Sequence, residues 1–459
     1  MDNKMMIAAA VVVIVVIAGA AAFFMMNQSS DSDGEGKLVG KVLKEAEYPA
    51  DASRLWVYGN ANEDDKINED DITYLKAVVA GTKKATVLSD ANADGKVDQQ
   101  DVDRVTELVR ANANTKLAVY YVDNYHTVSA VHWPVTSIAI GFSAGGYLAD
   151  LTGLVDKVKM VDWCLSATDW KHINSKYATL PSFGEEEEPN LEAVLEQKID
   201  VFVPGYCVTT IDDKSRTFFK GTSTDCMFVN TCDKDGGGDD TAQKDIDRSI
   251  VMFAYLLQGD MDQTYEYLEW HDEVIGEIED AVKSLADKDK VRYIMFRTAP
   301  SYVTTGQYTI AGNGNTCIYH SEIAGATCAG LDSELSDTYQ DLDEDAIYSI
   351  VEKYSQDGTF VIIDNENDGI RGQRPLTETV PSIMNMMSKS KIDITYCGFA
   401  RELCNSGLYL AETAFYLNVF YPELSGDIDY LEIFDYYLEN FVSEDLSEYV
   451  YLDHFFYIE

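Results

Sequence analysis

The sequence has few basic residues and no cysteine before residue 164. Its 459 residues include 35 Lys and Arg against 79 Asp and Glu, which gives a formal net charge of −44 at pH 7. A surface of this sign repels phosphate backbones and attracts cations, so the composition argues against a nucleic-acid partner. The hydrophobic content of 46% argues against a disordered chain, and the length is sufficient for two or three domains.

Zinc-binding patterns are also missing. No CxxC pair occurs and the six His are scattered along the chain, so we do not expect a tetrahedral zinc site. All eight Cys lie after residue 160, and an even number in an exported chain is compatible with disulfides. Spacing does not determine their connectivity, but three close pairs suggest local disulfides: Cys226/Cys232, Cys317/Cys328 and Cys397/Cys404.

A long apolar run lies near the N-terminus. Met5 to Met26 spans 22 residues, enough to cross a hydrocarbon core of about 30 Å as a helix. Lys4 precedes the run and an acidic stretch follows it, so we expect residues 1–27 to form a membrane anchor with the bulk of the chain extracellular. The alternative is a signal peptide cleaved near Ala20-Ala21-Ala22, although its apolar core is usually shorter. Without a nearby Cys, a bacterial-type lipid anchor is excluded.

A short internal repeat follows a linker at residues 28–54. GNANEDDKINEDDITYLKAVVAG is echoed thirty residues later by SDANADGKVDQQDVDRVTELVRA. Each copy contains a twelve-residue stretch with oxygen-bearing side chains at positions 1, 3, 5, 9 and 12. Calcium loops take their ligands from these positions and from the carbonyl at position 7. We therefore expect Ca²⁺ to bind two loops in a small all-α module at residues 55–112.

The second copy fits the calcium pattern better than the first. Its ligands would be Asp90, Asn92, Asp94, the Lys96 carbonyl, Asp98 and Asp101, with Gly95 at the sharp turn. The first copy would use Asn60, Asn62, Asp64, the Lys66 carbonyl, Asn68 and Asp71. There Asp65 replaces the glycine and Asn60 carries no charge, so the first loop should bind more weakly. Metal-free Asx-rich turns are the competing interpretation, which the matched Ile67 and Val97 at position 8 disfavour.

The duplication resembles a type I dockerin module. Each loop ends in Asp and is followed by one helix rather than flanked by two, and the likeness covers about sixty residues. The resemblance implies a cohesin-like partner. The alternative is a stiffened spacer beside the membrane anchor, and the sequence does not choose between the two.

From Lys116 onward, short β-rich runs alternate with helical stretches. The runs are LAVYYV, TSIAIGF, DKVKMVDW, IDVFVPG, VRYIMFR, GTFVIID and KIDITYC. This alternation predicts an α/β fold with largely parallel sheets, in two Rossmann-like lobes at residues 115–245 and 288–459. Helical spacing of apolar residues predicts a single connecting helix over residues 246–287. The tyrosine-rich and phenylalanine-rich run 408–459 is expected to be helical and to pack on a lobe.

Four pieces of this region resemble, in order, the helical-backbone class of ABC-transporter solute-binding proteins. VYYVDNYHTVSAVHWPVTSIAI resembles the opening hairpin and first core strand, and GFSAGGYLADLTGLVDKVKMVDW the next helix and strand. LPSFGEEEEPNLEAVLEQKIDVFVPG resembles a later helix and strand, and SGLYLAETAFYLNVFYPEL the closing helices. The resemblance implies a non-enzymatic protein with two lobes on one rigid helix. Such a protein binds a metal chelate of the ferric siderophore, haem or cobalamin type and delivers it to an ABC permease. The stretches DNENDGIRGQRPLTETVPS and CDKDGGGDD depart from the family and weaken any transfer of ligand identity.

Ligand-binding residues are expected where the carboxyl ends of parallel strands meet helix N-termini. By this rule the candidates are Ser143, Ala144, Trp170 and Tyr206 in the first lobe, and Arg297, Tyr302 and Arg401 in the second. Arginine pairs bidentately with carboxylates and so suits a carboxylate-bearing chelate. An ordinary surface or core position is the alternative interpretation for each of them.

Two other functions compete with solute binding. Residues 141–145, GFSAG, match the G-x-S-x-G nucleophile elbow of serine hydrolases, with a strand before and a helix after. The hydrolase hypothesis is weakened because no HGGG-type sequence occurs and the later histidines carry no distinctive motif; these are His172, His271, His320 and His454. The other alternative is a cell-surface assembly or adhesion protein that acts through the dockerin-like module.

Overall fold

The computed structural model describes most of the chain from residue 34 onward. The described residues are 34–50, 52–166, 174–185, 188–204, 209–229, 242–297, 307–312, 315–331, 339–364, 384–385, 387–399, 403, 406–443 and 455–458. Several predictions therefore fall outside them: the apolar run 5–26 and the candidates Trp170, Tyr206, Tyr302 and Arg401. No helix within the described ranges is long and apolar enough to cross a membrane.

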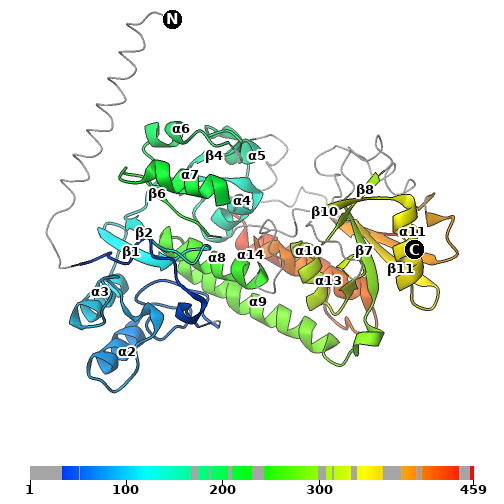
Figure 1. Ribbon diagram of the computed structural model, residues 1–459, viewed down its shortest axis with the longest axis horizontal. Coiled ribbons are helices and arrows are strands. Elements are labelled where there is room, and N and C mark those ends of the chain that lie inside the picture. The colour runs from blue at the N-terminus through cyan, green and yellow to red at the C-terminus, as the bar shows by residue number, and fades with distance from the viewer. Residues whose placement is uncertain are drawn as a thin grey trace, which may run out of the picture.

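The N-terminal module contains two short helices, each directly after one of the predicted calcium loops (Figure 1). Helix α2 covers Glu69–Val79 and α3 covers Gln99–Val109, with the short 3₁₀ turns η1 Glu45–Glu47 and η2 Val87–Ser89. Both helices begin at an Asx residue, because the side chains of Asn68 and Asp98 accept hydrogen bonds from free N–H groups of the first turn. Ile72, Leu75, Val102 and Val105 on the two helices form a small core together with Ala61 and Ala91 of the loops.

The module also shares the main hydrophobic core of the molecule. Residues before the first loop pair with the first strand of lobe 1: Tyr58 N donates to Tyr120 O at 2.9 Å and Val122 N to Trp56 O at 2.9 Å. The Arg248 guanidinium lies 3.5 Å from the centre of the Trp56 ring. The module is therefore packed against the body of the protein.

Lobe 1 opens with an antiparallel hairpin, β1 Leu117–Val122 and β2 Val128–Trp133. Its main sheet has the order β4-β3-β5-β6 with every pair parallel: β3 Ile138–Ile140, β4 Val158–Val161, β5 Val201–Val203 and β6 Asp225–Cys226. The helices are α4 Phe142–Leu151, α5 Trp163–Ser166, α6 Leu191–Glu196 and α7 Thr209–Phe219, with 3₁₀ turns η3 Val155–Lys157 and η5 Tyr177–Thr179. Strand β3 is buried along its whole length, as expected for a parallel strand with helices on both faces.

Lobe 2 is built on a mixed sheet with the order β10-β8-β7-β11-β12-β13, to which β9 adds beside β7. The strands are β7 Arg292–Arg297, β8 Gln307–Ala311, β9 Thr327–Cys328, β10 Tyr339–Asp343, β11 Thr359–Asp364, β12 Asp393–Phe399 and β13 Phe455–Ile458. Strands β7, β9, β11 and β12 are parallel, whereas β8, β10 and β13 pair antiparallel. Helices α10 Thr316–Ile323 and α11 Glu344–Tyr354 complete the lobe. All seven predicted strands are confirmed, but the final run is not wholly helical, because it ends in β13.

The prediction of one helix over residues 246–287 is wrong. Two helices occupy this stretch, α8 Ala242–Leu256 and α9 Met261–Val282, followed by η6 Asp287–Asp289. Lobe 1 holds the break between them: Asp260 N donates to Thr152 O at 2.8 Å, and a Cβ on Gly259 would lie 2.5 Å from the same oxygen. Lys157 Nζ also donates to the carbonyls of Leu257 and Gln258, each at 2.8 Å.

Helices α13 Tyr409–Phe420 and α14 Tyr430–Phe441, preceded by η10 Ser406–Leu408, lie in the centre of the molecule (Figure 1). Helix α13 packs on both α9 and α10, while η10 contacts α4 of lobe 1. Beyond α14, Ser443 N donates to Asp150 of α4 at 2.9 Å. The closing helices therefore connect the two lobes in addition to α9.

One predicted disulfide is absent. Cys317 on α10 and Cys328 on β9 are both buried and no disulfide joins them. Burial raises the pKa of Cys328 to about 11, so its thiol stays protonated at neutral pH. The other two proposed pairs each include a cysteine outside the described residues, Cys232 and Cys404.

Candidate functional site

The second predicted calcium loop is closed by hydrogen bonds to the carboxylates of its first and last residues. Asp90 at position 1 accepts hydrogen bonds from Asp94 N at 3.0 Å and Gly95 N at 2.8 Å. Asp101 at position 12 closes the loop by accepting from Asn92 N at 3.2 Å and from the amide at position 9. Gly95 has φ +92°, which explains why glycine is needed at position 6.

This loop concentrates negative charge away from water. Asp90, Asn92, Asp94 and Asp101 are all buried. Burial raises the pKa of Asp90 to about 6 and also raises that of Asp101, because ionised carboxylates are costly to desolvate. A bound cation would remove that cost, and the donor set of carboxylate, amide and carbonyl oxygens suits Ca²⁺. Within the described ranges, no three His, Cys, Asp or Glu side chains form a metal-binding group on their own, so coordination would depend on the amide and carbonyl oxygens as well.

The first loop is closed in the same way as the second but has an asparagine at position 1. Asp71 closes this loop as Asp101 closes the other, accepting from Asn62 N at 3.2 Å and Asn68 N at 2.8 Å. Asn60 is fully buried, and its Nδ2 donates to Leu55 O at 2.8 Å while its Oδ1 accepts no hydrogen bond. That oxygen is the position 1 donor that a cation would use.

Asp65 at position 6 joins this loop to the connecting helix. Its carboxylate accepts from Arg54 N and Nε, both at 2.8 Å, and Arg54 also donates to both oxygens of Asp272 on α9 at 2.8 and 3.1 Å. Tyr265 of α9 donates to Asp65 O at 3.0 Å. Burial opposes ionisation of Asp272, but hydrogen bonds from His271 and Arg54 still lower its pKa to about 2. The residue that departs from the calcium pattern therefore docks the module on α9.

In lobe 1, Ser143 and Ala144 lie in the first turn of α4, after β3, as the topological rule predicts. Both side chains are buried. The N-terminus of α4 is already capped from within, because Phe142 N donates to the buried carboxylate of Asp162 at 2.7 Å. Asp162 also accepts from Leu165 N at 2.9 Å, so one residue positions the starts of α4 and α5.

The GFSAG turn differs from a nucleophile elbow. In an elbow the serine is on the strained turn and its hydroxyl is exposed. Here the left-handed residue is Phe142, with φ +62°, and Ser143 is 1% exposed. These observations favour a packing role for the motif.

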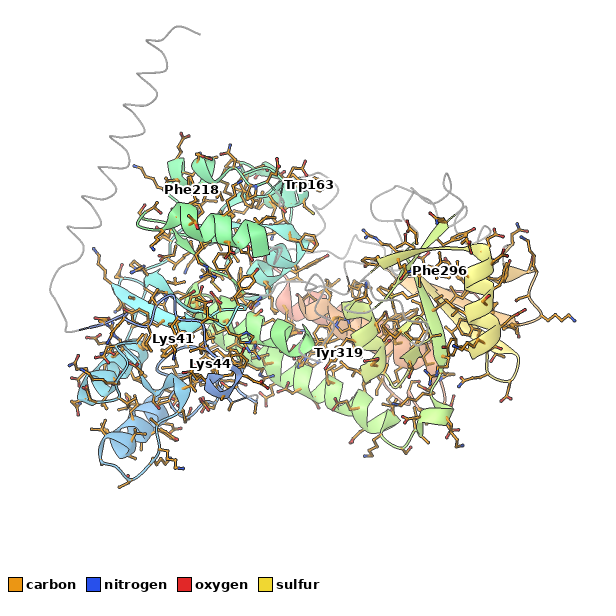
Figure 2. The ribbon with its side chains drawn as sticks, in the orientation of Figure 1. Lys41, Lys44, Trp163, Phe218, Phe296 and Tyr319 are labelled. Carbon is orange, nitrogen blue, oxygen red and sulfur yellow. The ribbon has the colours of Figure 1, made fainter. Side chains whose placement is uncertain are left out.

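Sequence reasoning missed the aromatic side chain that is exposed at the carboxyl end of β4. Trp163 is 45% exposed, while its backbone is held by a hydrogen bond from Trp163 N to Gly184 O at 2.9 Å. Figure 2 shows it on the edge of lobe 1 that is turned toward lobe 2. The same topological rule could have selected it, because it is the first aromatic residue after the strand.

In lobe 2, Arg297 is the last residue of β7, at the predicted strand end. Its guanidinium lies 4.6 Å from the centre of the Tyr339 ring. On the neighbouring strand β11, Asp364 is fully buried and accepts a hydrogen bond from Tyr396 at 2.7 Å. Among the described residues, the strand ends therefore carry the Arg297 guanidinium and the buried Asp364 carboxylate in lobe 2, and in lobe 1 the buried Asp162 carboxylate and the exposed Trp163.

A buried acid at the start of α7 gives lobe 1 a pH dependence. Asp212 is 1% exposed and accepts from the Tyr125 hydroxyl, and its other oxygen has no hydrogen-bond partner. Burial raises its pKa to about 7, against about 3.9 in an unfolded chain. Between about pH 4 and pH 7 the folded state keeps a proton that the unfolded state has lost. The free energy of unfolding should therefore fall as the pH rises through that window.

We expect Asp212→Asn to raise the free energy of unfolding at pH 8 by about 2–4 kcal/mol, because it removes the cost of ionising a buried carboxyl. The substitution should also flatten the pH dependence between pH 4 and pH 7. Urea unfolding across that range measures both effects. Asp213→Asn, which changes the exposed neighbour, is the matched control. Equal pH profiles for wild type and Asp212→Asn would contradict the assignment.

Two histidines lie where the connecting helices meet. His271 of α9 contacts the hydroxyl of Tyr409, which donates to Asp247 at 3.1 Å. His320 of α10 stacks on the Tyr409 ring, with the ring centres 4.6 Å apart. Together with Arg54 and Asp272, these residues form a continuous series of contacts from the first predicted calcium loop to the centre of the molecule.

His320 is also paired in the core. Its Nδ1 lies 2.9 Å from Glu412 Oε2 on α13, and both side chains are fully buried. The other oxygen of Glu412 accepts from the Tyr416 hydroxyl at 2.7 Å. This pair joins lobe 2 to the closing helices.

Comparison with solved structures finds the same fold among periplasmic binding proteins. The TroA-like periplasmic binding protein FepB from Veillonella parvula matches with a TM-score of 0.54 at 12% identity, covering 70% of this chain and 96% of that one. The molybdate periplasmic binding protein MolA from Haemophilus influenzae matches with 0.53 at 13% identity, covering 70% and 97%. Helicobacter pylori CeuE with Ni(II) bound matches with 0.50 at 14% identity, covering 73% and 99%. At this identity the likeness establishes the fold. No protein-family model matches the chain, and no curated protein matches its sequence.

Proposed function

We propose that this chain is an extracellular solute-binding protein that holds a small metal chelate between its lobes and delivers it to an ABC importer. The observation that carries the proposal is the two-lobe fold shared with FepB, MolA and CeuE over about 70% of the chain. MolA is bound to molybdate and CeuE has Ni(II) bound in these structures. A ferric siderophore, haem or cobalamin is the cargo that the sequence resemblance implies. Ser143 is buried and the left-handed residue of the turn is Phe142, which favours binding over hydrolysis.

Trp163 and Arg297 are the described side chains best placed to hold such a ligand. An exposed tryptophan on a fixed backbone supplies a flat apolar surface at little conformational cost. A guanidinium supplies paired donors for a carboxylate or oxyanion. The net charge of −44 repels anions from most of the surface. An anionic ligand would therefore bind where a cationic side chain such as Arg297 offsets this repulsion.

We further propose that the apolar run Met5 to Met26 anchors the chain in the membrane and that Ca²⁺ binds the module, the second loop more tightly than the first. Asp65 supports a spacer role for the module, because Arg54 ties it to Asp272 of α9. A rigid spacer needs this fixed contact, whereas a cohesin-binding module could function on a flexible linker. Assembly through a cohesin-like partner is therefore the second candidate.

A ligand screen on the full chain in detergent tests the function. Thermal midpoint and tryptophan fluorescence are followed against ferric siderophores, haem, cobalamin and molybdate. A true ligand should raise the midpoint as its concentration rises. If none of these compounds shifts the midpoint while calcium does, solute import is contradicted and the assembly role is favoured.

Once the screen has identified a ligand, we expect Trp163→Ala to weaken its affinity about tenfold, which corresponds to about 1.4 kcal/mol of binding free energy. Isothermal titration calorimetry measures the change. Tyr436→Ala is the matched control, since Tyr436 is a 39% exposed aromatic residue on α14. Equal affinities for the two variants would show that Trp163 does not touch the ligand.

A further inference from the structure

The segment Lys37–Lys44, which we call the strap, differs from the rest of the chain in charge and exposure. It reads KLVGKVLK, three lysines without an acidic residue, in a protein with more than twice as many acids as bases. Two of its valines are among the most exposed large apolar side chains of the described residues: Val39 is 47% exposed and Val42 is 64% exposed. The strap therefore combines apolar and cationic side chains at the surface.

Backbone hydrogen bonds hold the strap in place. Leu38 N donates to Ala93 O, within the second calcium loop, at 2.9 Å. Gly40 N donates to Val128 O at 2.8 Å, and Val128 N returns a bond to Lys41 O at 2.9 Å. The exposed valines are thus displayed on a fixed backbone supported by the module and by β2.

The side chains of the strap divide into an inner and an outer set. Leu43 is 5% exposed and belongs to the main core, and Leu38 packs against the same core. Lys37 and Lys44 are exposed with Val39 and Val42, so the outer set is apolar and basic. Lys41, also exposed, pairs with Glu47 at 2.8 Å.

The strap follows the predicted membrane anchor closely in the sequence. Ten residues lie between Met26 and Lys37, and the eleven Cα–Cα steps from one to the other span at most roughly 40 Å when extended. A surface so close to a membrane anchor stays within reach of the bilayer. Figure 2 shows Lys41 and Lys44 on the module side of the molecule, away from lobe 2, so contact there would leave the strand ends around Trp163 accessible.

We propose that the strap is a membrane-contact surface on which Val39 and Val42 enter the headgroup region while Lys37 and Lys44 bind lipid phosphates. This inference rests on the proposed membrane anchor. Lysine is suited to the task because its apolar stem can lie along the headgroups while its ammonium reaches the phosphates. Each lysine near an anionic surface is worth about a fivefold change in partition, so the strap would set the orientation of a chain that is otherwise repelled.

Photocross-linking to lipid tests the proposal on the full chain. A photoreactive phenylalanine analogue replaces Val42, Val79 or Val13 one at a time, and each protein is reconstituted in phosphatidylcholine vesicles with and without phosphatidylglycerol. Val79 is the matched control, because it is a 43% exposed valine on α2 that also has lysines nearby in sequence. Val13 reports on the anchor itself.

We expect lipid adducts at positions 13 and 42 and few at position 79, with more at 42 when phosphatidylglycerol is present. Adducts at 13 but no more at 42 than at 79 would overturn the strap and leave the anchor intact. Adducts at 42 without adducts at 13 would support the strap and refute the anchor. Adducts at neither would overturn both.

A charge reversal supplies the second measurement. Lys37→Glu with Lys44→Glu should lower the adduct yield at position 42 toward that at position 79, about fivefold for each lysine on anionic vesicles. Lys41 is left unchanged because it pairs with Glu47. Lys76→Glu with Lys84→Glu, two exposed lysines of the module, should leave the yield unchanged. An unchanged thermal midpoint confirms that each variant folds, and an equal loss of adducts in both pairs would overturn the assignment to the strap.

Discussion

Calcium should raise the free energy of unfolding of this chain by about 3 kcal/mol at a hundredfold excess over its dissociation constant, and Asp90→Ala should remove most of that gain. The reason is electrostatic. Asp90 and Asp101 are buried in one loop, and burial raises the pKa of both, so a divalent ion relieves a cost that the metal-free fold must bear. Removing position 1 deletes a ligand that is central to the loop.

Urea unfolding with excess calcium and with chelator measures this gain. Asp103→Ala is the control, because it removes an exposed acid of α3 outside the ligand set. An equal calcium response in Asp90→Ala and Asp103→Ala would refute the second loop as the tight site. No response in the wild type would support metal-free Asx turns instead.

Glu412→Ala should lower the free energy of unfolding by about 3–5 kcal/mol, because it removes one partner of a fully buried pair. His320 loses the acceptor at its Nδ1, and the Tyr416 hydroxyl loses the carboxylate to which it donates. Both groups stay in the core, where an unsatisfied donor costs more than the hydrogen bond itself contributes. The substitution should destabilise both lobe 2 and the closing helices, since the pair joins α10 to α13.

Chemical denaturation of Glu412→Ala beside Glu423→Ala measures this effect. Glu423 is exposed beyond the end of α13, so its removal should change stability little. A cost below about 1 kcal/mol for Glu412→Ala would mean that the core readily replaces the lost acceptor. In that case the pair would not be a main link between lobe 2 and the centre.

The Glu412–His320 pair is also connected to the N-terminal module. The first predicted calcium loop reaches α9 through Arg54, and His271 and Tyr409 continue the contacts to His320. Ca²⁺ in the module and a ligand between the lobes would therefore stabilise parts of the same core. This arrangement fits a spacer that also braces the lobes.

Much of the fold was predictable because its signals are local in the sequence. The apolar composition of a run such as TSIAIGF predicts a buried strand, and each of the seven predicted runs contains a strand in the structure. The pattern that predicts the calcium loops is equally local, since twelve contiguous residues carry the candidate ligands and the cap of the next helix. The topological rule also placed Ser143 and Arg297 at strand ends, as the structure has them.

Tertiary structure decided what depends on partners distant in the chain. The connecting stretch is two helices because Thr152 and Lys157 of lobe 1 bind its backbone at the break, and periodicity within the stretch cannot show such a contact. The sequence also did not predict which side chains are exposed. Trp163 is exposed and Ser143 is buried, although both follow strands.

By itself, the sequence determined the positions of seven strands, the acidic composition and the candidate ligand pattern of two loops, because each of these depends on neighbouring residues. Only the tertiary structure decided that Asp65 docks on a helix 207 positions later through Arg54, that Glu412 meets His320 and that the final residues add β13 to a sheet. The physical reason is that composition and periodicity report which side chains avoid water. Which groups pair when they do so is set by the packing of the whole chain.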